Sequence, residues 1–338
     1  MNPTWKDHLT KTGAAIENDR AIHFGNPEKE LQAAQSGTIL ADLSHRGIIG
    51  IGGEDSQTFL QGQTTNDVRL AAGQAQHNSL CTPKGRMLAS FLLWRTDDGY
   101  ALQLPAELLA GIQKRLTMYV LRAKVKLRDA SEESVRFGVA GADAGRLLQG
   151  IFGVLPTDTL NVANHERGTV IRLGPASFEV IASPEQGPAL WDELSKGATP
   201  AGSACWEWLE IRAGAPVILP PTQEQFTPQM VNFEVLGGVS FAKGCYTGQE
   251  IVARTQYLGK VKRRLYLAHI DSDHTPQPGD EVFGAEETSG MVVNVQPAPG
   301  GGFDLLAVIP TGAVDAGAVR YKTPDGPILG ILPLPYPV

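Results

Sequence analysis

Three runs with the character of β-strands follow one another along the chain, at 77–81, 87–95 and 100–104. The segments between them, Pro-Lys-Gly at 83–85 and Asp-Asp-Gly at 97–99, have the composition of tight turns. Short strands joined by such turns are typical of antiparallel hairpins. The pattern therefore predicts an antiparallel meander in the first third of the chain.

Apolar positions change to a helical spacing after Pro105, where Leu108, Leu109, Ile112 and Leu116 fall on one face. Proline is well tolerated in the first turn of a helix, so we expect a long amphipathic helix to start there. Further helices are predicted over 27–36, from residue 54, and over 143–152, 187–196 and 203–213, and further strands over 38–43, 47–51, 135–140, 168–173 and 177–182.

The pattern changes after Gly259. Strand-like runs at 264–270, 290–295 and 305–309 alternate with turns rich in proline and glycine, and no helical spacing remains. This pattern indicates a small all-β barrel. We therefore expect an α+β protein with a first α+β segment at 1–130, a second at 131–259 and a β-barrel at 260–338.

Composition narrows the class of protein without giving a function. Of 338 residues, 42% are hydrophobic and 19% charged, and the net charge is −7. These values are typical of a folded chain and exclude a disordered chain or one coated with basic charge. A mildly acidic chain does not attract nucleic acid through its overall field.

The cysteines and the start of the chain bear on location. Cys81, Cys205 and Cys245 are odd in number and widely spaced, which disfavours a disulfide framework or a closed zinc site. The first residues lack the apolar core of a signal peptide, and apolar stretches such as 89–94 are too short to span a membrane. We expect a protein of the cytoplasm or of an organelle matrix.

Residues 237–254 are the segment richest in chemical features. Thr247 and Glu250 form a capping box, which predicts a helix from about 248 to Leu258, closed by Gly259. Cys245 then lies just ahead of the helix N-terminus, where the positive end of the helix dipole favours a thiolate.

The neighbours of Cys245 support a functional thiol over a small buried hydrophobe. Lys243 and Arg254 supply positive charge, and Gly244 and Gly248 leave the backbone open to a ligand. Cys81 and Cys205 have no such surroundings and are expected to be ordinary core residues. No Ser–His–Asp or Cys–His arrangement is recognisable among the seven histidines.

Basic residues are concentrated between 243 and 264, where six basic residues accompany only Glu250 and give a local charge of +5. One interpretation is a solvated strand end. The other is an anion site for a phosphate, a polyglutamate tail or an RNA backbone. The basic residues are Lys243, Arg254, Lys260, Lys262, Arg263 and Arg264.

Two further features are candidates for binding a flat heterocycle. Trp206 and Trp208 are two positions apart on one predicted helix, so both should not be buried easily, and one could line a cavity. The polar block at 61–68 contains Asp67. That block is either a helix end with local turns or the source of a carboxylate for a pterin-like ring.

The octapeptide Lys-Gly-Cys-Tyr-Thr-Gly-Gln-Glu at 243–250 resembles the signature of the YgfZ family, folate-binding proteins related to the glycine-cleavage T protein. Mitochondrial relatives of that family assist the maturation of iron–sulfur enzymes. The similarity extends to 42–46, 59–68, 213–216 and 226–229, and so covers most of the chain.

This resemblance implies a T-protein-like fold, with two α+β segments and a C-terminal barrel arranged as a ring around a tetrahydrofolate site. Trp206 matches a tryptophan that the family associates with folate, and Asp67 matches an aspartate at the pterin. Lys243 and Arg254 are further candidates for folate contacts. Arg46 stands where another folate-associated tryptophan is found, a departure that weakens that contact.

A larger departure concerns catalysis. The T protein carries acidic residues in the strand that matches 84–90, where this chain has Ala89 and Ser90. Arg212 also replaces a frequent acid. Aminomethyl transfer needs a group that handles a proton at the amine. We therefore expect the shared fold without aminomethyltransferase activity.

The resulting hypothesis is a folate-binding accessory protein for iron–sulfur cluster assembly or repair that uses Cys245. Its partners would be cluster-containing enzymes such as tRNA-thiolating radical enzymes, so its influence on tRNA modification would be indirect. One alternative is a folate-dependent one-carbon transferase or demethylase, with Asp67 as its carboxylate. The other is direct tRNA binding through the basic residues at 243–264. Whether any reaction is turned over stays open.

Overall fold

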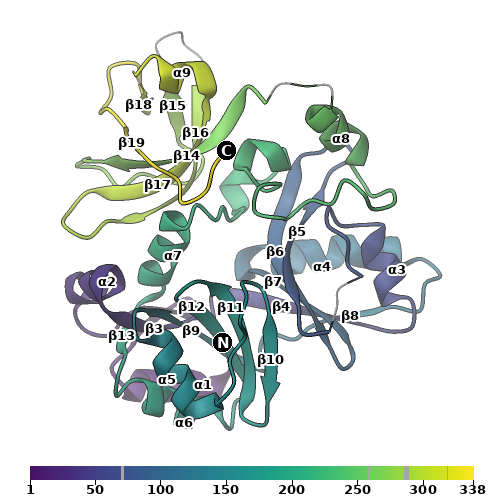
Figure 1. Ribbon diagram of the computed structural model, residues 1–338, viewed down its shortest axis with the longest axis vertical. Helices are drawn as coiled ribbons and strands as arrows, with labels where there is room; N and C mark the ends of the chain where they lie inside the picture. The colour runs from purple at the N-terminus through teal and green to yellow at the C-terminus, as the bar shows by residue number, and fades with distance from the viewer. Residues whose placement is uncertain (70–71, 258, 260, 285–288, 318) are drawn as a thin grey trace.

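The computed structural model describes residues 1–69, 72–257, 259, 261–284, 289–317 and 319–338. Three lobes surround a common centre, each built on its own sheet (Figure 1). We call them the first sheet, the second sheet and the C-terminal sheet. Among the described residues, no helix combines the length and apolar character needed to cross a bilayer.

The first sheet has the strand order β5-β6-β7-β4-β8, and all neighbours are antiparallel. Three consecutive strands at one side of this sheet, β5, β6 and β7, are the predicted meander. The helix predicted from Pro105 packs on one face of this sheet and buries Leu108, Leu109, Ile112 and Leu116. The elements are β4 (Arg46–Gly52), α3 (Ser56–Gln61), β5 (Ala75–Cys81), β6 (Met87–Thr96), β7 (Gly99–Pro105), α4 (Ala106–Val120) and β8 (Lys126–Asp129).

The second sheet has the order β10-β11-β12-β9-β3-β13. The helices α1, α5 and α6 bury one face of it, and α2 and α7 bury the other. A small hairpin of β1 and β2 precedes it. The elements are α1 (Pro3–Lys11), β1 (Ala15–Glu17), β2 (Arg20–His23), α2 (Pro27–Ser36), β3 (Thr38–Asp42), β9 (Val135–Gly141), α5 (Ala144–Phe152), β10 (Val162–His165), β11 (Gly168–Gly174), β12 (Ser177–Ala182), α6 (Gly187–Leu194), β13 (Thr199–Ala201) and α7 (Ser203–Arg212).

The chain passes between these two sheets early. Strand β3 pairs antiparallel with β9 and parallel with β13, so it belongs to the second sheet. Only residues 43–45 separate it from β4 of the first sheet. The boundary that we expected at residue 130 is therefore not the division between the sheets, because residues 3–42 pack with residues 135–212.

The tail forms the predicted β-structure, a curled antiparallel half-barrel with the order β18-β15-β16-β17-β14-β19. The expectation of no helix is wrong, since a short helix, α9, follows β17. The elements are β14 (Arg263–Ile270), β15 (Glu281–Phe283), β16 (Ser289–Pro297), β17 (Phe303–Pro310), α9 (Thr311–Asp315), β18 (Arg320–Tyr321) and β19 (Gly330–Leu332).

Two segments join the lobes. Helix α7 packs against the second sheet and against β16 and β17 of the C-terminal sheet. The segment after it carries the short helices η1 (Pro220–Thr222) and η2 (Pro228–Val231) and then α8 (Gln249–Tyr257). Its apolar residues share one core with Met87 of the first sheet and Leu265 of the C-terminal sheet. The three lobes are thereby held around the centre.

Candidate functional site

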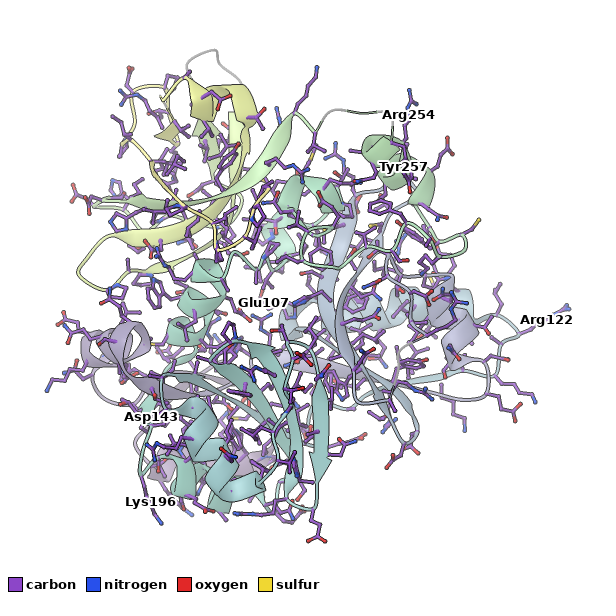
Figure 2. The ribbon with its side chains drawn as sticks, in the orientation of Figure 1. Glu107, Arg122, Asp143, Lys196, Arg254 and Tyr257 are labelled. Atoms are coloured by element: carbon purple, nitrogen blue, oxygen red, sulfur yellow. The ribbon has the colours of Figure 1, made fainter. Side chains whose placement is uncertain are left out.

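A cavity of about 440 Å³ lies where the three lobes meet, and its lining comes from all of them. Figure 2 shows one of these residues, Glu107, close to the centre of the molecule. The polar residues that line it include Arg20, His45, Arg46, Glu207, Glu210 and Gln296.

Ion pairs organise this central cavity. The carboxylate of Glu207 accepts hydrogen bonds from Arg20 and from Gln296, while Arg46 pairs with Glu210. The ring of His45 is buried beside Arg46 and Arg20. Burial, together with these guanidinium groups, holds the pKa of His45 well below its ordinary value. The imidazole is therefore neutral at physiological pH.

A narrower pocket of about 90 Å³ adjoins the central cavity, and both are lined by Arg46 and Glu210. The indole of Trp206 lines this inner pocket. It lies against Gly138 of β9, where an added Cβ would be 2.2 Å from a ring carbon. A glycine in the strand is what lets the indole lie there. The inner pocket therefore offers a flat aromatic side chain at the end of a larger opening.

The inner pocket also holds a buried carboxyl that the sequence did not reveal. Glu179 of β12 lines the pocket, and its Oε1 accepts a hydrogen bond of 2.7 Å from Nε2 of Gln103. Burial raises the pKa of Glu179 to about 7, against the opposing effect of Gln103 and Arg136. Such a group is able to give or take a proton near neutral pH. A lone glutamate within the strand-like run at 177–182 was the available signal.

The expectation that Trp206 and Trp208 are not both buried is wrong. Trp208 is buried on the opposite side of α7, where its Nε1 donates a hydrogen bond of 2.9 Å to Asp304 of β17. Both indoles are covered because α7 is enclosed between the second sheet and the C-terminal sheet. Of the two, Trp206 lines the inner pocket.

Cys245 lies elsewhere, on the loop before α8, and its side chain is exposed. Helix α8 begins at Gln249, as predicted, while the predicted end at Leu258 is outside the described residues. Cys81 and Cys205 are buried as expected, and burial raises the pKa of each thiol to about 12.

Lys243 is not an exposed cation beside Cys245. It is buried, and its Nζ donates hydrogen bonds to the carbonyl oxygens of Thr64, at 2.6 Å, and Asn66, at 2.8 Å. The ammonium lies 5.1 Å from the centre of the Tyr246 ring. Burial lowers the pKa of Lys243 to about 8. This residue ties the loop that carries Cys245 to the polar block at 61–68.

The polar block at 61–68 makes further contacts with the chain that precedes Cys245. The side chains of Thr65 and Asn66 donate hydrogen bonds to the carbonyls of Gly238 and Gly237. Asp67 binds the guanidinium of Arg69, and these hydrogen bonds hold the pKa of its carboxyl well below the usual range. In the structure, the block binds Gly237, Gly238 and Lys243, and so supports the chain that leads to Cys245.

The basic residues at 243–264 do not form one exposed surface. Lys243 is buried, and Arg264 binds Glu234 and the carbonyl oxygen of Gln229. Arg254 is exposed on α8 and points outward in Figure 2. Lys260 lies outside the described residues. The basic residues on which the anion-site interpretation depended thus lie in separate environments.

The sequence-predicted site residues therefore fall into two groups. Two of the predicted site residues, Trp206 and Arg46, line the cavities. Lys243, Cys245 and Arg254 belong to the loop and helix at 243–257. Asp67 lies with the polar block that supports this loop. We call the two cavities with their lining residues the central site, and residues 243–257 the cysteine loop. Among the described residues, no cluster of three or more His, Cys, Asp or Glu is arranged to hold a metal ion.

Comparison with known proteins agrees with this architecture. Residues 3–239 match the family model of the GCVT N-terminal domain. The crystal structure of glycine cleavage system aminomethyltransferase T from Bartonella henselae superposes with a TM-score of 0.80 and 17% identity, covering 99% of this chain and 97% of that one. At this identity the match establishes the fold.

Curated relatives give the family. The tRNA-modifying protein YgfZ of Pectobacterium carotovorum is 31% identical over 315 residues, 91% of this chain and 94% of that protein. The protein of the same name from Cronobacter sakazakii is 35% identical over 260 residues, 76% of this chain and 78% of that one. The resemblance found in residues 243–250 is confirmed, and the chain belongs to the YgfZ family, with a GCVT N-terminal domain at residues 3–239.

Proposed function

We propose that this chain is a folate-binding accessory protein that supports the assembly or repair of iron–sulfur clusters and thereby influences tRNA modification indirectly. The observation that carries the proposal is the inner pocket, which combines the Trp206 indole with the Glu179 carboxyl and opens into the central cavity. A flat heterocycle suits the indole and carboxyl of the inner pocket, and a long tail would have room in the central cavity that adjoins it.

In this proposal, each part of tetrahydrofolate has a partner in the central site. Trp206 would stack on the pterin ring, and Glu179, with a pKa of about 7, would hydrogen-bond its polar edge. Folate would supply a carrier for a one-carbon unit. The tail would extend through the central cavity past Arg20 and Arg46, both of which already have carboxylate partners.

Polyglutamylation belongs to the proposal as a modest addition. Because those two arginines are paired, each added glutamate should contribute only about 0.2–1 kcal/mol at a solvated site. Titrations with monoglutamyl and polyglutamyl tetrahydrofolate at low and high salt would measure that preference.

Cys245 would act on a protein substrate. The thiol is exposed on a loop that Lys243 fixes in place, so it is accessible to a second macromolecule. A thiolate attacks a disulfide or a persulfide, or ligates iron transiently. Cluster-containing enzymes such as tRNA-thiolating radical enzymes are the proposed partners, and the cytoplasm is the proposed location. The name shared by the curated relatives, tRNA-modifying protein, supports this direction.

The folate half of the proposal is tested by titrating tetrahydrofolate while tryptophan fluorescence is recorded. Wild type should bind with quenching, and Trp206→Ala should weaken binding about tenfold, since ring stacking contributes on the order of 1 kcal/mol. Trp208→Phe is the matched control, because Trp208 is on the same helix but contacts Asp304. Absence of binding to wild type would remove folate from the proposal.

The thiol half is tested in cells that lack the endogenous protein. Cells receive wild type, Cys245→Ser or the control Cys205→Ala, and thiolated tRNA nucleosides and cluster-enzyme activities are measured. Both readouts should fall with Cys245→Ser and stay normal with the control. Full complementation by Cys245→Ser would contradict a role for the thiol.

A second candidate, a folate-dependent one-carbon transferase or demethylase, is favoured by Glu179. That residue, and not Asp67, provides a proton-exchanging carboxyl in the inner pocket. Glu179→Gln should abolish turnover of a one-carbon-substituted tetrahydrofolate if this candidate is correct. The direct tRNA-binding alternative relied on one exposed basic surface at 243–264, whereas Lys243 and Arg264 have protein partners.

A further inference from the structure

The C-terminal end of α4 exposes apolar side chains in a group. Met118 is 60% exposed, Tyr119 42% and Leu121 87%. The adjoining Arg122 projects from the edge of the molecule in Figure 2. Single exposed apolar residues are ordinary, but a group of them within four positions indicates an interaction surface. We call residues 114–126 the α4-end surface.

The exposure of Leu121 is built into the fold. Its backbone has φ 47° and ψ −105°, a costly conformation for a residue with a side chain. The following turn is anchored, because the amide of Lys124 donates a hydrogen bond of 2.7 Å to Asp55. Gly53 packs so closely that an added Cβ would be 2.1 Å from the carbonyl oxygen of Lys124. The chain is therefore held in a strained shape that presents a leucine to solvent.

The chain segment that carries these apolar residues is rich in basic residues. Residues 108–128 include six basic residues and no acidic residue, in a chain of net charge −7. Lys124 pairs with Glu54 and Arg128 with Glu133. In the part of the chain that the structure describes, Lys114, Arg122 and Lys126 have no acidic partner within 4.0 Å.

Charge and side-chain type together indicate what kind of molecule binds to the α4-end surface. A symmetric contact with a second copy would place these cations against each other, which disfavours self-association. Single-stranded RNA is usually bound by aromatic side chains that stack on its bases. Met118 and Leu121 are not aromatic, and Arg115 already lies over the Tyr119 ring, 5.9 Å from its centre. Aliphatic side chains are best buried against apolar protein side chains.

We propose that the α4-end surface docks a partner protein whose contact face has apolar side chains surrounded by aspartate and glutamate. Leu121 and Met118 provide the apolar anchors, and Lys114, Arg122 and Lys126 pair with the surrounding carboxylates. The proposal is independent of folate and of Cys245, so its failure would leave the proposed function intact.

The test uses the full chain and a fluorescent synthetic peptide of about 14 residues, with leucines on one helical face and glutamates elsewhere. Wild type should bind it more tightly than a scrambled peptide of the same composition, as measured by anisotropy. Leu121→Gly should weaken binding about tenfold, and so should Lys114→Glu/Arg122→Glu. Lys196→Glu is the matched control, on the opposite side of the molecule in Figure 2.

Leu121→Gly separates loss of contact from loss of fold. Glycine adopts a positive φ without strain, so this variant should unfold at a higher temperature than wild type while it binds the peptide less well. Equal affinity for the patterned and scrambled peptides, or no binding of either, would overturn the proposal. Binding of tRNA or of anionic phospholipid vesicles that Leu121→Gly abolishes, without peptide binding, would also overturn it.

Discussion

Lys243 donates hydrogen bonds to two backbone carbonyls, while the thiol of Cys245, two residues later, is exposed. The lysine is thus a positioning residue, and the cysteine is the group available to a partner. Burial that lowers the pKa of Lys243 to about 8 shows that the ammonium is held at a cost in solvation. The two carbonyl oxygens and the Tyr246 ring that face the ammonium offset part of that cost.

The three thiols should differ sharply in reactivity. In the native protein, iodoacetamide should label Cys245 first, because Cys81 and Cys205 are buried and burial raises the pKa of each to about 12. Mass mapping after brief exposure at neutral pH measures the order of labelling. Denatured protein, in which all three thiols should react, is the control. Native labelling of Cys81 or Cys205 at a rate similar to that of Cys245 would contradict the structure.

Glu179 predicts a specific dependence of stability on pH. Because burial raises its pKa to about 7, the native state keeps a proton that the unfolded state releases above its ordinary pKa of 4.5. This contribution to stability is full below the ordinary value and is lost as pH rises through 7.

Glu179→Gln removes this titration and keeps an acceptor for Gln103. The variant should match wild type at acidic pH and exceed its unfolding free energy by about 2–3 kcal/mol at about pH 8. Urea unfolding of both proteins across that range is the measurement. Parallel pH profiles would show that Glu179 titrates normally.

At this scale, the sequence predicted the residue types of the site better than their positions. Trp206 and Arg46 line the inner pocket, whereas Asp67 lies with the cysteine loop. Glu179 was missed because alternation along a strand does not show whether an inward side chain meets a core or a pocket. Lys243 was placed with the exposed cations because spacing does not reveal the distant carbonyls that bind it.

At the scale of elements, α8 and the turn between β5 and β6 are in close contact. Gly248 has φ +86°, and an added Cβ would be 2.4 Å from the carbonyl oxygen of Thr82 and 3.0 Å from Cα of Gly85. The expectation that Gly248 keeps the backbone open for a ligand is therefore wrong. Its missing side chain allows the helix N-terminus to pack on the first sheet.

The two glycines beside Cys245 give a matched pair of substitutions. Gly248→Ala should destabilise the protein by about 2–4 kcal/mol, from strain at positive φ together with the clash against backbone. Gly244→Ala should change little, because nothing lies within 4 Å of its Cβ position. Urea unfolding measures both variants, and hydrogen exchange over residues 240–257 reports whether α8 detaches. Similar stability for the two variants would refute the packing argument.

Elements with a strong apolar pattern were predicted well, and elements defined by their partners were not. Helix α4 shows its buried stripe in the sequence. Helix α1 was missed because only Trp5 and Leu9 of its residues are buried. Strand β13 has three residues and exists through pairing with β3. Helix α9 is similarly short, and no residue of it is buried.

At the scale of the whole molecule, Asp304 connects the lobes. This buried carboxylate on β17 accepts hydrogen bonds from Nε1 of Trp208 on α7 and lies 2.8 Å from Nδ1 of His269 on β14. Arg212 adds a longer contact at 3.5 Å. The C-terminal sheet is thereby attached to the helix whose other side supplies Trp206 to the inner pocket.

Asp304→Ala should destabilise the protein by about 2–4 kcal/mol, since it leaves buried donors without an acceptor. It should also expose the junction between α7 and the C-terminal sheet to limited proteolysis. Asp271→Ala is the control, because that carboxylate is 93% exposed and lies 3.5 Å from His269. Equal resistance of wild type and Asp304→Ala to protease would show that other contacts hold the lobes together.

The early passage of the chain from the second sheet to the first has a consequence for its folding during synthesis on the ribosome. Strand β3 is made before β4, yet its neighbours β9 and β13 are translated after the whole first sheet. Residues 46–129 contain an apolar core of their own and are expected to fold once they emerge, while Trp5, Leu9 and β3 must wait for distant sequence. In stalled nascent chains long enough for residue 130 to have emerged from the ribosome, protease should cleave residues 1–42 and spare the first sheet. Chains long enough for residue 212 to have emerged should protect both. Early protection of residues 1–42 would mean that they find a temporary partner during synthesis.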